Sequence, residues 1–136
     1  MRAMGIDYGE VRIGIALSDE MKILATPYET YNQKNKTTDE TIEYFMNIIN
    51  EKKVDEIVIG LPLNMKGEEQ DIAIKTREFA LALSNVSKLN PIFIDERLTS
   101  VLVNRIMNET NMSWQDRKKV IDKMSAAAIL QTYLER

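Results

Sequence analysis

Apolar residues at the start of the chain gather in short runs of the kind that form β-strands. Residues 3–6 and 11–17 make two such runs, and the segment between them carries Asp7 and Gly9. Because the chain must reverse within a few residues, the pattern predicts a hairpin with an acidic side chain at its mouth. Gly14 lies inside the second run, where a missing side chain lets another backbone or a ligand approach closely.

The rest of the chain alternates strand-like runs with helical spacing. We first expect an edge strand at 22–30, interrupted by Pro27, then a helix at 38–53 that begins with a Thr37–Glu40 capping box, and a buried strand at 54–60. A helix that buries Ile72, Phe79, Leu83 and Val86 follows, and then a strand at 92–94. Thr99 or Ser100 begins the next helix, which carries Leu102, Val103 and Ile106; a polar connector at 108–119 leads to a last helix, capped by Ser113 and running towards Leu134. This order predicts an α/β fold, a mixed sheet with helices on its faces.

Composition narrows the chemistry. The chain has 136 residues, a net charge of −3, no His and no Cys. We expect one domain spanning 1–136, and a cytoplasmic protein because neither a signal peptide nor a membrane span is visible. Without imidazoles and thiols, catalysis must use other side chains or a hard metal ion bound through oxygen. The overall charge gives no attraction to nucleic acid, so such a partner would need a local basic patch.

Acidic residues stand at positions that packing alone would not select. Asp7 ends the first strand, Asp95 and Glu96 end the last, and Asp122 lies on an otherwise apolar stripe of the final helix. Sites in such sheets form beyond the carboxyl ends of the strands, so these acids are expected to meet. Clustered carboxylates repel unless a cation intervenes, which favours Mg²⁺ or Mn²⁺. Two such ions, roughly 4 Å apart, suit hydrolysis of a phosphodiester bond.

Four segments closely resemble the signature blocks of the YqgF/RuvX family of Holliday-junction-resolvase-like proteins. They are GIDYGEVRIGIALSD, IVIGLPLNMKG, DERLTS and DKMSAAAILQTYLE, spread over nearly the whole chain in the family's order. Members are regarded as nucleases that process the end of precursor small-subunit ribosomal RNA. The resemblance implies a ribonuclease H-like fold with a five-stranded sheet, and a nuclease activity dependent on Mg²⁺ or Mn²⁺.

The resemblance also implies which residues form the site. It assigns catalysis and metal binding to Asp7, Glu96 and Asp122, with Asp95 as a further metal ligand. The residues at the phosphate-facing turns would be Gly9, Arg12, Gly60, Pro62, Asn64, Gly67, Arg97 and Thr99. Arg117, Lys118 and Lys119 directly precede the acid-bearing helix and are candidates for binding nucleic acid.

Each of these residues also has an ordinary structural explanation. Asp7 can be a turn residue, Glu96 can pair with a neighbouring arginine on the surface, and Asp122 can be screened by nearby lysines. The residues from Arg117 to Lys119 can be a solvated helix end. Asp95 and Glu96 are adjacent and should face different ways, so strand geometry leaves open which of them is the main ligand.

Three functions compete for this pattern. The first is a metal-dependent endonuclease acting on structured RNA, with the 5′ end of pre-16S ribosomal RNA or a branched DNA junction as its substrate. The second is an ATP-binding domain like those of sugar kinases and actin-like ATPases, although such proteins need two domains of this kind. The third is a nucleic-acid-binding module without catalysis. A monomer and a weak homodimer are both compatible with the sequence.

Overall fold

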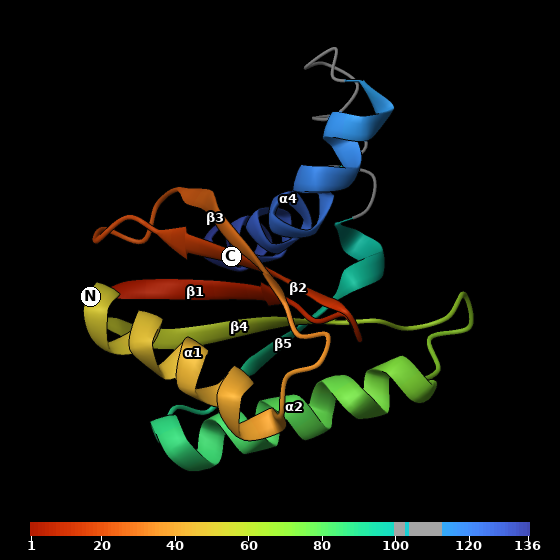
Figure 1. Cartoon of the computed structure of the whole chain (residues 1–136). Coiled ribbons are helices and arrows are strands. Elements are labelled where there is room, and N and C mark those ends of the chain that lie inside the picture. Colours follow the sequence, from red (N-terminus) through yellow and green to blue (C-terminus); the bar gives the residue numbers. More distant parts are fainter. Residues whose placement is uncertain (100–102, 104–112) are drawn as a thin grey trace.

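The computed structural model describes residues 1–99, 103 and 113–136. A single sheet lies at its centre, with α1 (Thr38–Lys52) and α2 (Asp71–Ser87) on one face and α4 (Trp114–Leu134) on the other (Figure 1). The strands are β1 (Arg2–Asp7), β2 (Arg12–Ser18), β3 (Ala25–Asn32), β4 (Val54–Leu61) and β5 (Ile92–Asp95), and a short 3-10 turn, η1 (Glu96–Leu98), follows β5. The predicted mixed five-stranded sheet between helices is confirmed.

The order of the strands across the sheet is β3-β2-β1-β4-β5. β1, β2 and β3 pair antiparallel, whereas β4 runs parallel to both β1 and β5. The predicted hairpin is therefore present, and β3 lies at an edge of the sheet, where Pro27 does least harm to the hydrogen-bond ladder. Because β1, β4 and β5 are parallel, their carboxyl ends lie at the same end of the sheet, which brings their terminal residues near each other.

Alternation along the strands builds two different cores. Met4 and Ile6 of β1 pack with Phe45 of α1 and Phe79 of α2, in the larger core. Ala3, on the other face of β1, belongs to a second core in which α4 contributes a run of buried alanines. Because successive side chains of a strand point to opposite faces, Asp7 shares the α4 face with Ala3.

Small residues let α4 lie close against the sheet. A Cβ at Gly14 would stand 1.9 Å from the carbonyl oxygen of Asp122, and one at Gly5 would stand 2.6 Å from that of Ala126. Real Cβ atoms never approach backbone so closely, so only glycine fits at either position. The expectation that Gly14 admits a neighbouring backbone is confirmed, and that backbone belongs to α4 at the residue that carries one of the predicted acids.

Most of the predicted element boundaries hold. The Thr37–Glu40 capping box is present, and α1 ends with Lys53 in the left-handed conformation. Ser113 caps α4 by accepting a hydrogen bond from the amide of Asp116, at 3.2 Å.

Three expectations change. Val86 is 55% exposed, so it does not share the buried side of α2 with Phe79 and Leu83. β3 begins at Ala25 rather than 22, because Asp19 ties down the preceding turn by accepting hydrogen bonds from the amides of Ile23 and Leu24. Residues 114–119 are helical, so the expected connector is wrong for this part, and residues 108–112 lie outside the described residues.

The helix expected from Thr99 or Ser100 falls mostly on residues 100–102 and 104–112, which lie outside the described residues. Within the described part, Val103 is helical and its amide donates to the carbonyl of Thr99, at 3.1 Å. None of the helices in the described ranges is both long and apolar enough to span a membrane.

Candidate active site

The Asp7 carboxyl lies at the carboxyl end of β1, on the face covered by α4. Burial raises the pKa of Asp7 well above its ordinary value. A hydrogen bond with the Glu96 carboxyl and the negative charges of Glu96 and Asp122 raise this pKa further. Asp7 of β1 therefore lies close enough to Glu96 of η1 and to Asp122 of α4 for both of them to act on its carboxyl.

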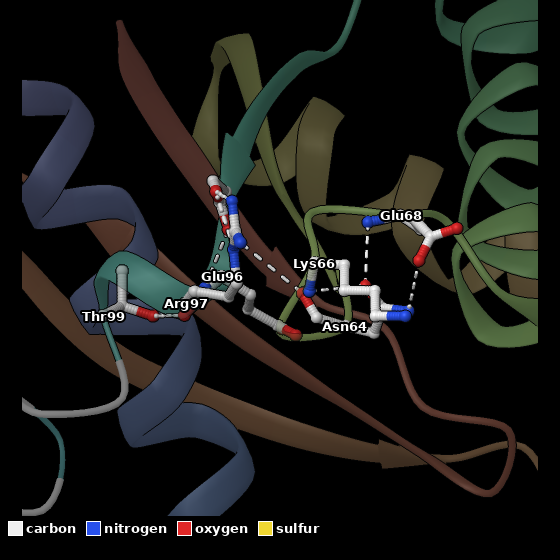
Figure 2. Close-up of polar contacts among 7 residues, drawn as sticks. Asn64, Lys66, Glu68, Glu96, Arg97 and Thr99 are labelled. Carbon is white, nitrogen blue, oxygen red and sulfur yellow. Dashed lines mark hydrogen bonds and ion pairs between the residues drawn. The ribbon is translucent and has the colours of Figure 1, made fainter.

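Glu96 reaches this point because β5 ends one residue earlier. Its side chain lies over Gly60 of β4, where an added Cβ would stand 3.0 Å from Glu96 Oε1. Thr99 fixes the main chain of η1, because its hydroxyl donates a hydrogen bond to the Glu96 carbonyl at 2.9 Å (Figure 2). Thr99 is only 2% exposed, so in this structure it supports Glu96 rather than facing solvent.

Asp122 is carried over β2 by α4, and its carboxylate pairs with Arg12. The Arg12 Nε donates to Asp122 Oδ2 at 2.9 Å, with the arginine side chain 55% exposed and the aspartate side chain 21% exposed. Arg12 is the first residue of β2, two residues before Gly14 on the same strand. The ion pair thus joins α4 to the start of β2.

The chemistry of these three side chains fits a hard divalent cation. Carboxylate oxygens are the preferred ligands of Mg²⁺ and Mn²⁺, and a cation would relieve the repulsion that raises the pKa of Asp7. As the described side chains stand, no three acids are already placed to hold a metal ion. Asp122 is turned to Arg12, so sharing a cation requires its carboxylate to move.

Asp95 is adjacent to Glu96 but points elsewhere. Alternation along β5 puts Ile94 in the α4 core and Phe93 against the other core, so Asp95 starts on the face opposite Asp7. Its carboxylate accepts from the Arg97 amide and pairs with the Arg97 guanidinium at 2.6 Å. This ion pair holds the pKa of Asp95 below its ordinary value. The structure does not bring Asp95 into the group formed by Asp7, Glu96 and Asp122.

Arg97 links η1 to the loop that follows β4. Its Nη1 approaches the carbonyl oxygen of Asn64 at 3.5 Å, and Figure 2 shows the two chain segments joined at this point. The loop is shaped by Asn64, whose Oδ1 accepts from the amides of Lys66 and Glu68 at 2.9 Å each. Gly67 completes the turn with φ +81°, a conformation that glycine adopts without strain. The side-chain oxygen of Asn64 therefore shapes its own loop, beside the arginine.

The turn at Gly9 depends on Gln33, a residue that the sequence analysis did not single out. Gln33 donates through its side-chain amide to the Gly9 carbonyl at 2.7 Å, and its backbone amide donates to Val11 at 2.8 Å. These bonds fasten the hairpin that carries Asp7. No local signal marks Gln33, because the contact joins positions 24 residues apart in sequence.

The basic residues before Asp122 are only partly described. Arg117 lies in the first turns of α4, half-buried, with its amide donating to the Ser113 carbonyl at 2.9 Å. The side chains of Lys118 and Lys119 lie outside the described residues. Their expected role in binding nucleic acid stays a prediction.

Comparison with known proteins shows which family the chain belongs to. The family model described as "RuvX: Holliday junction resolvase" matches residues 1–136. The chain belongs to the RuvX family. Among RuvX relatives, proteins of Syntrophomonas wolfei and Ruminiclostridium cellulolyticum are 43% and 42% identical, over 99% and 100% of this chain and 94% and 95% of their own lengths. Both are named "Putative pre-16S rRNA nuclease".

Solved structures of resolvases share the fold of this RuvX chain. RuvC of Thermus thermophilus, solved with a Holliday junction substrate, superposes with a TM-score of 0.55 at 12% identity, covering 98% of this chain and 93% of RuvC. The fowlpox virus Holliday junction resolvase gives a TM-score of 0.57 at 12% identity, covering 99% and 98%. At such low identity the likeness establishes the ribonuclease H-like fold alone.

Proposed function

We propose that the chain is a metal-dependent endonuclease that hydrolyses phosphodiester bonds in structured RNA, and that its substrate is the 5′ end of pre-16S ribosomal RNA. The observation that carries the proposal is the meeting of Asp7, Glu96 and Asp122 at one end of the sheet in a RuvX chain. The names of the relatives support the choice of substrate.

Asp7, Glu96 and Asp122 would hold Mg²⁺ or Mn²⁺, which supplies an activated water and neutralises the charge that develops on the leaving oxygen. In the reaction, a water oxygen forms a new bond to phosphorus and loses a proton to solvent, while the bond to the leaving ribose oxygen breaks and that oxygen takes up a proton from solvent. Arg12 and Arg97 are the cations that we assign to the phosphates on either side. Asp95 orients Arg97 for this purpose through their ion pair.

The test is a cleavage assay on a 5′-extended pre-16S transcript with Mg²⁺, Mn²⁺ or a chelator. We expect Asp7→Asn, Glu96→Gln and Asp122→Asn each to lower the rate by more than about 100-fold, because changing even an outer partner of a metal ligand costs about 10- to 100-fold. Glu43→Gln, an isosteric change on the exposed surface of α1, is the matched control and should cleave normally. Cleavage that survives both the chelator and Asp7→Asn would end the proposal.

A four-way DNA junction is the second candidate substrate, because the matching family description names a Holliday junction resolvase. The same assay on a synthetic junction separates the two. Preferential cleavage of the junction would replace RNA by branched DNA in the proposal. Binding of either nucleic acid without any cleavage would instead identify a non-catalytic module.

A further inference from the structure

A pocket of about 280 Å³ opens beside the β1–β2 turn, on the face of the sheet opposite Asp122. Its walls come from the turn itself, from the start of α1 and from the first half of α2, which lie at the same end of the sheet (Figure 1). The volume is at the small end of the range for ligand sites, so it suits one compact ring system. None of the residues assigned above to metal or phosphate lines it.

Tyr8 connects this pocket to the candidate active site. It follows Asp7 directly, and alternation turns its side chain to the other face, where it packs against the larger core. Its ring lies 4.9 Å from that of Phe79, with the planes inclined by 32°. Tyr8 and Phe79 are both among the residues that line the pocket, so part of its wall is aromatic. An aromatic surface in such a place favours a flat partner that can stack on it.

The polar part of the lining carries no net charge. Lys75 pairs with Glu10 at 3.0 Å, and Glu78 stands in the same lining one helical turn further along α2. A phosphate would meet the Glu78 carboxylate as well as the lysine, so the pocket is a poor anion site. Thr38 and Gln33 add neutral hydrogen-bonding groups at the rim. The lining therefore suits a flat, neutral ligand that hydrogen-bonds along its edges.

We infer that the pocket receives one unpaired nucleobase of the substrate strand, next to the phosphate that reaches Asp7. The inference rests on the proposed function for the identity of the substrate as nucleic acid. Asp7 and Tyr8 are consecutive and face opposite sides of the sheet. A nucleic-acid strand that crosses the end of β1 can therefore place a phosphate on the Asp7 face and the neighbouring base on the Tyr8 face. A base that is paired in a duplex cannot enter, so the enzyme selects substrates with an unpaired nucleotide beside the cleavage point.

The experiment measures binding rather than cleavage, in the Asp7→Asn background. The probe is a single-stranded pre-16S leader RNA in which one abasic nucleotide is moved stepwise along the strand. We expect the abasic site to weaken binding about 10-fold at one position only, because a base stacked on an aromatic side chain contributes this order of affinity. 2-Aminopurine at that position should lose fluorescence on binding.

Protein variants show whether Tyr8 is responsible. Tyr8→Leu should abolish the penalty for the abasic nucleotide, whereas Tyr8→Phe, which keeps the ring, should retain it. If Tyr8→Leu does not fold, Thr38→Met carries the comparison: it narrows the pocket from the exposed start of α1, leaves the Thr37 cap in place and should reduce the penalty. A uniform response to the abasic site at every position, or an equal penalty in Tyr8→Leu and Tyr8→Phe, overturns the inference.

The inference and the proposed function fail separately. If Asp7→Asn abolishes metal-dependent cleavage but the abasic nucleotide has the same effect at every position, the proposed nuclease stands and the base pocket is refuted. A single sensitive position without any cleavage leaves the pocket and removes the nuclease.

Discussion

At the scale of single residues, the Asp7 carboxyl is half-buried and lies near two other acids. Its unfolded form ionises near the ordinary pKa of about 3.9, whereas the folded form keeps its proton to a higher pH. Folding therefore binds the proton more tightly than the unfolded chain does. The contribution of Asp7 to stability is full below the unfolded pKa and is lost as the pH rises towards the folded pKa.

Asp7→Asn should consequently stabilise the metal-free protein at neutral pH. The gain in the free energy of unfolding should be about 1.4 kcal/mol for each unit by which folding raises the pKa of Asp7, and it should vanish near pH 3. Urea unfolding of the two proteins with a chelator at pH 3, 5 and 7.5 measures this difference. A variant that is less stable than the native chain at pH 7.5 would contradict the clustering of the acids.

Arg12 competes with metal for Asp122, because its Nε already occupies one carboxylate oxygen. Arg12→Ala should raise the affinity for Mn²⁺ by about 1.4- to 5-fold, the range that an exposed ion pair of about 0.2–1 kcal/mol allows. Arg12→Lys keeps the charge and should change the affinity less. Calorimetric titration with Mn²⁺ checks both variants. Weaker Mn²⁺ binding by Arg12→Ala would show that Arg12 assists the site rather than competing for it.

At the scale of elements, the contact between α4 and the sheet sets where Asp122 lies. Sequence reasoning identified Gly14 as a point of close approach but did not show what approaches. The approaching backbone belongs to a helix more than 100 residues later in the chain.

The choice between Asp95 and Glu96 was open for a similar reason, since it depends on β5 ending at Asp95 and on Arg97 turning back to pair with it. Val86 was misplaced because its spacing from Phe79 and Leu83 is helical, yet its side chain is 55% exposed.

Gly14→Ala tests this contact. A methyl group 1.9 Å from the Asp122 carbonyl cannot be accommodated by a side-chain rotation, so α4 must move away from β2. We expect a loss of about 3 kcal/mol or more in the free energy of unfolding, at the upper end for overpacking, and a loss of cleavage in the protein that still folds. Val11→Ala, at an exposed position two residues before β2 begins its buried run, is the control and should change stability little. Unchanged stability in Gly14→Ala would mean that α4 does not lie against β2.

At the scale of the whole molecule, the fold was predictable because each level of the sequence agrees with the others. Alternating runs, the Thr37–Glu40 cap and the Pro27 edge strand all point to the same sheet. The meeting of the three acids was also expected, since β1 and β5 end on one side of a largely parallel half-sheet. The ion pairs of Arg12 and Arg97 could not be predicted, because the partners of long exposed side chains depend on where the folded backbone places them.

Metal should stabilise the whole chain, because the three acids come from its beginning, its middle and its end. At a concentration 100 times the dissociation constant, Mn²⁺ should add about 2.7 kcal/mol to the free energy of unfolding of the native protein. Asp7→Asn should gain much less. Thermal unfolding with and without Mn²⁺, followed by a chelator, measures the effect and its reversal. Equal stabilisation of both proteins would place the bound ion elsewhere.

The position of Asp122 on the last helix has a consequence for protein synthesis. A growing chain presents Asp7 early and Glu96 later, but it has no third acid until α4 has been made and has settled over β2. If these three acids are the site that we propose, the unfinished chain cannot cleave RNA before that point. The order of the elements along the chain therefore brings the three acids together only after α4 has been made.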